Sequence, residues 1–135
     1  MSSVPGHPVL MHTVVDATDV DEVAEFYRVL LGLRYRPGDE GDPDWRVLLD
    51  DAGRRVLAVQ RVDTLHRSTW PADDVPKQLH MDFRVPDVDE LERQRRRAEE
   101  LGAQLLFDRT DDEGEPLYVF ADPAGHPFCV MVNPG

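Results

Sequence analysis

The chain has 135 residues and a formal net charge of −12 at pH 7. We expect one compact domain over residues 1–135, and an acidic chain of this kind is a poor partner for nucleic acid or an anionic membrane. A single cysteine, Cys129, excludes an internal disulfide and suits a reducing compartment. The sequence shows no apolar run of the roughly 20 residues that span a bilayer and no signal-peptide pattern, so a cytoplasmic location is expected.

The first half of the chain predicts the order β-α-β-β-β. Residues 1–7 read as a loose tail, and alternating or apolar runs bounded by turn residues then predict strands. Cap residues mark the helix between them. The expected elements are strands at 9–15, 33–36, 45–49 and 56–62, and a helix that begins after Thr18 or Asp19 and ends at Gly32.

The second half predicts the same order. A stretch of about 15 residues, 63–77, comes before it and reads as a linker, either a strap packed by Leu65 and Trp70 or a lid over a site. The expected elements are strands at 78–85, 104–107, 117–121 and 128–132, and a helix from Asp87 to Leu101.

The two halves also repeat at the level of residues. His12 begins the sequence HTVVDATDVDEV and His80 begins HMDFRVPDVDEL, so each histidine stands seven residues before an Asp-Val-Asp-Glu run. The later turn Asp50-x-Ala52-Gly53 returns as Asp122-x-Ala124-Gly125. The repeat predicts two copies of one unit, a module over about 8–62 and a module over about 78–134, joined by the linker.

Two such modules predict an α+β fold in which they form a cupped, barrel-like mixed sheet with the helices on the outside. The concave faces would then enclose a cavity. On the first strand of the second module, His80, Asp82 and Arg84 alternate onto the face away from the helix, and His12 holds the equivalent place in the first module. Two converging imidazoles would be a reasonable start for a metal site.

The chain resembles the vicinal oxygen chelate superfamily, which includes glyoxalases, bleomycin-resistance proteins and extradiol dioxygenases. Its second half is most similar to the subgroup of glyoxalase-like domains. The resemblance covers nearly all of residues 8–133. It rests on Glu25-Phe26-Tyr27 and Leu31-Gly32 in the first half, and on Val85-x-Asp87, Leu101-Gly102 and Asp122-Pro123-x-Gly125-x-x-Phe128 in the second.

This resemblance implies a divalent ion, such as Zn, Fe, Mn or Ni, held by residues of the first and last strand of each module. His12 and His80 match the first-strand positions. The carboxylate that the family usually supplies falls on Cys129, and its counterpart in the first module falls on Leu57. Gln60 is the polar residue nearby, and we expect it to need a bulge or a shifted register to face the same way as Leu57.

Several alternatives stay open. The histidines could bind a metal, form a polar spot in a metal-free cavity, or serve the structure alone. Cys129 could be a thiolate ligand or a small buried apolar residue. Asp82 and Arg84 could orient a ligand or pair with each other.

Two functions follow. The first is a small-molecule enzyme of lyase, isomerase or dioxygenase type, with a metal ion that polarises two adjacent substrate oxygens. The second is a metal-free protein that sequesters a small, cationic compound, as bleomycin-binding relatives do. The acidic surface and the aromatic residues Trp45 and Trp70 motivate this second hypothesis. The resemblance also implies a homodimer, with cavities within or between chains.

Overall fold

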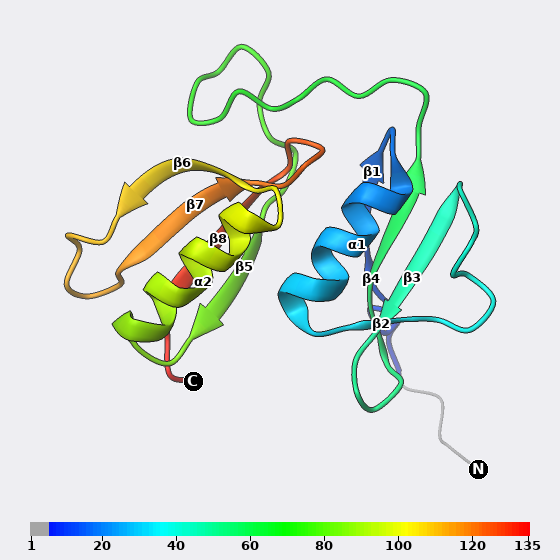
Figure 1. Cartoon of the computed structure of the whole chain (residues 1–135), viewed down its shortest axis with the longest axis horizontal. Coiled ribbons are helices and arrows are strands. Elements are labelled where there is room, and N and C mark those ends of the chain that lie inside the picture. Colours follow the sequence, from blue (N-terminus) through cyan, green and yellow to red (C-terminus); the bar gives the residue numbers. More distant parts are fainter. Residues whose placement is uncertain (1–5) are drawn as a thin grey trace.

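The computed structural model describes residues 6–135, which contain two helices and eight strands (Figure 1). The predicted tail falls mostly on residues 1–5 and so lies outside the described range. In chain order the elements are β1 (Thr13–Ala17), α1 (Val20–Leu31), β2 (Arg34–Tyr35), β3 (Trp45–Leu49), β4 (Arg55–Arg61), β5 (Met81–Val85), α2 (Val88–Glu100), β6 (Gln104–Arg109), β7 (Leu117–Ala121) and β8 (Pro127–Val132).

The strands form two mixed sheets of the same topology. Their orders are β1-β4-β3-β2 and β5-β8-β7-β6, and in each sheet the first strand of the module runs parallel to the last. Across residues 6–135 the two sheets remain separate and do not close into a barrel. The predicted fold class, α+β with two tandem βαβββ modules, is confirmed.

Local sequence signals explain where the helices begin and end. The side chain of Asp19 accepts a hydrogen bond from the backbone N–H of Glu22 at 3.2 Å, and Asp87 accepts from Glu90 at 2.8 Å. These are N-caps, which satisfy backbone donors that the first helical turn leaves free. Gly32 ends α1 with φ of 65°, a left-handed conformation that costs a glycine little. The two halves therefore start their helices at equivalent residues.

The helix-covered faces of the two sheets share one core. Tyr27 of α1 packs edge-to-face on Phe83 and Phe128 of the second module, at ring-centroid distances of 6.5 and 6.3 Å. Phe26 lies 5.8 Å from Phe128, so α1 packs between its own sheet and the sheet of the second module. The sequence led us to expect the opposite faces of the sheets to meet, and within one chain they do not.

Each sheet keeps a second face with its own smaller apolar cluster. In the first module this cluster comprises Val14, Trp45, Val47, Leu49 and Ala58. In the second module it comprises Trp70, Leu106, Leu117, Val119, Cys129 and Met131. The predicted site residues lie on these two faces.

The first strand of each module is shorter than predicted. β1 begins at Thr13, where its pairing with Leu57 begins, and not at Val9; β5 begins at Met81. Residues 6–12 form no strand, and Leu10 is 83% exposed. His12 and His80 therefore stand just before their strands.

The linker is an ordered strap. Arg67 donates a 2.8 Å hydrogen bond to the carbonyl of Pro123, and it lies against Gly125, whose φ of 94° belongs to the turn before β8. The backbone N–H of Thr69 donates to the carbonyl of Val75, and the N–H of Val75 donates to Oγ1 of Thr69, which closes a loop that carries Trp70. In residues 6–135, neither helix is both long and apolar enough to cross a membrane.

Candidate functional site

On the face of the second sheet that no helix covers, which we call its free face, one residue from each of the four strands lies in a single row. Asp82 on β5 pairs with Cys129 on β8, Cys129 pairs with Val119 on β7, and Val119 pairs with Phe107 on β6. Residues paired in this way lie about 5 Å apart and point to the same face. This row places a carboxylate and a thiol side by side.

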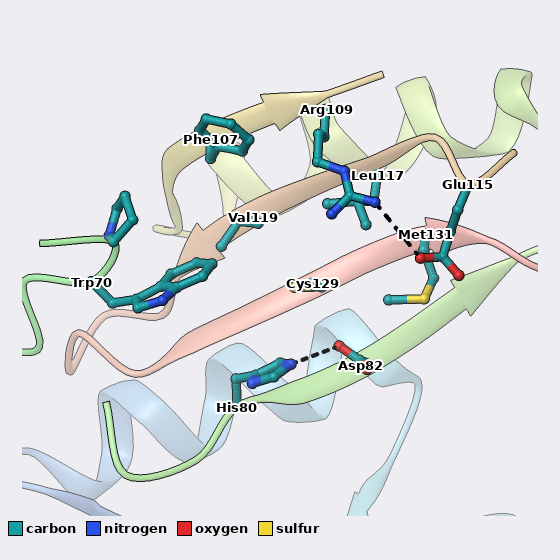
Figure 2. A pocket seen from close by; sticks show the side chains of 11 residues that line it. Trp70, His80, Asp82, Phe107, Arg109, Glu115, Leu117, Val119, Cys129 and Met131 are labelled. Atoms are coloured by element: carbon teal, nitrogen blue, oxygen red, sulfur yellow. Dashed lines mark ion pairs between the residues drawn. The ribbon is translucent and has the colours of Figure 1, made fainter. Parts of the chain in front are cut away.

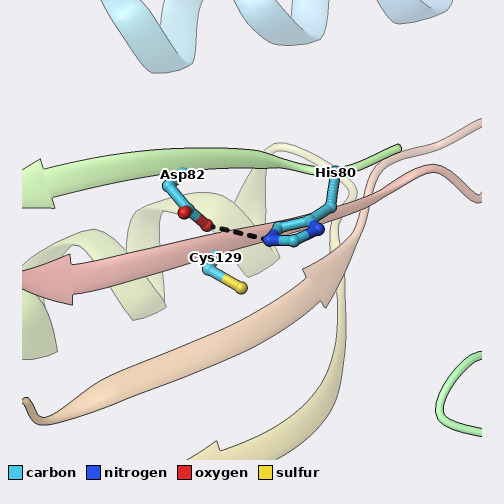
Figure 3. Close-up of side chains that lie close together, drawn as sticks. All are labelled: His80, Asp82 and Cys129. Atoms are coloured by element: carbon cyan, nitrogen blue, oxygen red, sulfur yellow. Dashed lines mark ion pairs between the residues drawn. The ribbon is translucent and has the colours of Figure 1, made fainter.

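His80, Asp82 and Cys129 form a compact group of potential ligands (Figure 3). Each offers one ligand atom, and these atoms all lie within 4.8 Å of one another. Nε2 of His80 is 3.3 Å from Oδ1 of Asp82. The sequence named all three residues as cavity residues, and the structure brings them together within one module.

A cavity of about 350 Å³ lies above this group (Figure 2). Trp70 of the linker and Phe107 bound one end, while Arg109 and Glu115 bound the other, and Pro71 also lines the cavity. The remaining lining residues are Leu117, Val119 and Met131, together with His80, Asp82 and Cys129. The cavity is therefore mostly apolar, with its ligand atoms on the floor.

Burial keeps the cysteine protonated when no metal is bound. Cys129 is 7% exposed, and burial, together with the charge and hydrogen bonding of Asp82, raises the pKa of its thiol to about 11. At neutral pH this thiol is a poor nucleophile, because the thiolate is the reactive form. A coordinated metal ion, in contrast, deprotonates a thiol.

The donor set fits a divalent ion. Ligand atoms of a tetrahedral zinc ion lie about 3.5 Å apart, since each is about 2.0–2.3 Å from the metal. The 3.3 Å between Nε2 of His80 and Oδ1 of Asp82 matches that spacing, and small rotations would bring in Cys129 from within 4.8 Å. Three protein ligands beside an open cavity leave a coordination position for water or substrate.

The predicted residues of the first module lie on the other sheet. The ring of His12 packs on Trp45 at 5.8 Å between centroids, and Trp45 pairs with Gln60. Burial, then the charges of Arg55 and Arg36, lower the pKa of His12, so its imidazole is neutral at pH 7. Its Nδ1 is buried without a hydrogen-bond partner among the described residues.

The strand register corrects one expectation in the first module. Val14, the counterpart of Asp82, pairs with Ala58, so Ala58 is the counterpart of Cys129. Leu57 faces the main core and is 1% exposed. Gln60, two residues after Ala58, shares the face of His12, and its position needs no bulge.

The structure places the other candidates less centrally. Trp70 lines the cavity. Arg84 lines other cavities, with Pro86 and Asn133 near the C-terminus. Seven lining residues were not predicted from the sequence, although alternation along β6, β7 and β8 places all but Pro71 and Glu115 on the face of Cys129: Pro71, Phe107, Arg109, Glu115, Leu117, Val119 and Met131.

Comparison with known proteins identifies the family. Residues 12–131 match the model of the glyoxalase-like domain, so the chain belongs to the glyoxalase-like domain family. A glyoxalase/bleomycin resistance protein/dioxygenase family enzyme from Burkholderia phytofirmans shares the fold, with a TM-score of 0.69 at 14% identity, covering 90% of this chain and 96% of that one. A search of curated proteins finds no match.

Solved structures of low identity share the fold. A possible glyoxalase from Bacillus cereus superposes with a TM-score of 0.66 at 18% identity, covering 91% of this chain and 97% of that one. The fosfomycin resistance protein FosX from Listeria monocytogenes gives 0.70 at 17% identity, covering 94% of each chain. Lactoylglutathione lyase from Agrobacterium tumefaciens gives 0.64 at 19%, covering 96% and 97%.

Proposed function

We propose that this protein is a small-molecule enzyme of lyase, isomerase or dioxygenase type that uses a divalent metal ion in the cavity of its second module. One observation carries the proposal: His80, Asp82 and Cys129 bring three different ligand atoms together on the cavity floor. A nitrogen, an oxygen and a sulfur ligand suit zinc best among Zn, Fe, Mn and Ni.

Each residue has a distinct part in this proposal. His80 supplies a neutral imidazole nitrogen, and Asp82 and Cys129 supply two negative charges that compensate a divalent ion. A bound ion would act as a Lewis acid toward substrate oxygens. A ligand that fills the space between Trp70 and the apolar walls would displace water from the floor, which strengthens electrostatic interactions there.

A second copy of the chain completes the site in this proposal. His12, Gln60 and Trp45 lie on the free face of the first module, and the cavity of the second module is lined without them. The free face of the first module borders two exposed apolar residues, Leu10, which is 83% exposed, and Met11, which is 60% exposed. A homodimer that pairs the first module of one chain with the second module of its partner would bury these residues and bring His12 to the open side of the cavity.

The test is elemental analysis of the full chain purified without chelator. The proposal predicts a stoichiometric transition metal in the wild type, and its loss in Cys129→Ala and in His80→Ala. His66→Ala is the matched control, because His66 lies at a different cavity and should not affect metal content. Absence of a bound transition metal, together with no activity gained on adding one, would refute the proposal.

The second candidate is a metal-free protein that sequesters a small molecule, as in the bleomycin-resistance type. It is favoured by the raised pKa of Cys129 and by the absence of Asp and Glu from β8. A screen of thermal shifts separates the two. A cationic glycopeptide that stabilises the chelator-treated protein supports sequestration, whereas stabilisation by zinc, lost in Cys129→Ala, supports the enzyme. A cytoplasmic location, where the thiol stays reduced, suits either candidate.

A further inference from the structure

The cavity has two chemically different ends. Trp70 and Phe107 bound one end with their aromatic rings (Figure 2), and Phe107 is 47% exposed. Arg109 and Glu115 bound the other end. Phe107 and Arg109 stand two residues apart on β6, about 7 Å along the strand, which is close to the length of a benzoate ion.

Arg109 is the one arginine or lysine among the residues that line this cavity, in a chain of net charge −12. Its Nη2 is 3.1 Å from Oδ2 of Asp112 and 4.0 Å from Oε1 of Glu115. Among the described residues, no acceptor is recorded for Nε or Nη1 of Arg109. The guanidinium is thus oriented by Asp112 and keeps donors for a further anion.

The ion pair between Arg109 and Glu115 is weak enough for a ligand carboxylate to take the place of Glu115. At 4.0 Å, with side chains 45% and 48% exposed, it is a solvent-screened contact of little energy. A ligand carboxylate can bind a guanidinium through two parallel hydrogen bonds, which is stronger and better oriented. Lys77, the only lysine in the sequence, lies 4.3 Å above the ring of Trp70 and adds a second cation beside the cavity.

The geometry points to a small aromatic acid as the ligand class of this cavity, with the ring between Trp70 and Phe107 and the acid group on Arg109. This inference rests on the proposed use of the same cavity. It makes Arg109 the residue that selects anionic substrates. A ligand that reaches from Phe107 to Arg109 also lies partly above the floor formed by His80, Asp82 and Cys129.

Benzoate is the probe, and its neutral isostere benzamide is the control ligand. Calorimetry on the zinc-loaded full chain should detect benzoate, with benzamide at least about tenfold weaker. Arg109→Gln should weaken benzoate roughly 10- to 100-fold and leave benzamide unchanged. Trp70→Ala should weaken both about 3- to 10-fold. Glu115→Gln should tighten benzoate, because it removes the competing carboxylate.

Arg93→Gln is the matched control, because Arg93 is an exposed arginine of α2 that pairs with Glu90 away from the cavity. It should leave benzoate affinity unchanged. Absence of benzoate binding to the wild type, equal binding of benzoate and benzamide, or an unchanged affinity in Arg109→Gln would each overturn the inference.

Repeating the titration on chelator-treated protein separates this inference from the metal proposal. Binding of benzoate that depends on Arg109 but persists without metal supports the inference even if elemental analysis finds no ion. A protein that retains its metal but shows no Arg109-dependent binding overturns the inference and leaves the metal site standing.

Discussion

The hydroxyl of Tyr27 donates a 2.6 Å hydrogen bond to Oδ2 of Asp122, which joins the helix of the first module to the last turn of the second. Both side chains are fully buried. The other oxygen of Asp122 accepts from the backbone N–H groups of Ala124 and His126. Burial and Asp122 raise the pKa of Tyr27 well above its usual value, so the hydroxyl remains a donor. This contact contributes to the relative placement of the two modules, together with the hydrogen bonds from Arg97 of α2 to two backbone carbonyls of α1.

Tyr27→Phe should destabilise the protein by about 1–3 kcal/mol, because it leaves a buried carboxylate oxygen without its donor. Urea unfolding measures the change. Tyr35→Phe is the control, since its hydroxyl bonds Glu25 at the surface and its loss should cost less. Equal effects of the two substitutions would contradict the role of Tyr27.

Cys129 should react slowly with iodoacetamide in metal-free protein. A rise in the pKa of the thiol from 9.0 to about 11 lowers the thiolate fraction near neutral pH roughly 100-fold. Reactivity should therefore increase only as the pH rises toward 11. Alkylation followed by mass spectrometry gives the rate at each pH.

Asp82→Asn tests the cause of that shift. Removing the carboxylate charge should lower the pKa of Cys129 and speed alkylation, while burial stays the same. Asp108→Asn, an exposed residue of β6 that bonds Thr110, should not change the rate. A rate that is insensitive to Asp82 would leave burial as the only cause.

His12 should titrate below the usual histidine pKa of 6.5 in metal-free protein. Burial and the charge of Arg55 disfavour the imidazolium. The folded state therefore loses stability as the pH falls below 6.5 towards the lower pKa of His12 in the folded protein. Arg55→Gln should raise the pKa toward 6.5. A proton NMR titration of the imidazole measures both values, and a wild-type pKa above 6.5 would contradict the environment described.

Sedimentation should show a homodimer of the 15.4 kDa chain. Met11→Glu places a charge on the exposed apolar end of the first module and should shift the equilibrium to monomer. Val88→Glu is the matched control, because Val88 is similarly exposed, at 53%, but lies on α2. A wild-type monomer would contradict the proposal that His12 of one chain completes the cavity of another.

The sequence predicted the modules well because their signals are local. The caps Asp19 and Asp87, the C-terminal Gly32 and the repeated turn each act within a few residues, and the structure confirms the elements that they bound. Strand alternation is also a local signal: it sets the face of Asp82, and His80 lines the same cavity, while the role of both residues stays a prediction.

The packing of residues far apart in the chain could not be predicted from local sequence signals. The contacts of Tyr27 with Phe83 and Phe128 decide which faces of the sheets meet, and they join residues far apart in the chain. The counterpart of Cys129 was misplaced on Leu57, because the offset between the repeats is 72 at the turns but 71 in the last strands. A single residue of offset reverses the face of a strand residue.

The most direct test of the metal site at His80, Asp82 and Cys129 is a cobalt(II) titration followed by absorption spectroscopy. The wild type should develop an ultraviolet thiolate-to-cobalt charge-transfer band that saturates at stoichiometric cobalt and is displaced by zinc. Cys129→Ser should bind without this band, and Asp82→Asn should bind more weakly. A wild-type protein that shows no charge-transfer band at saturating cobalt would contradict the site.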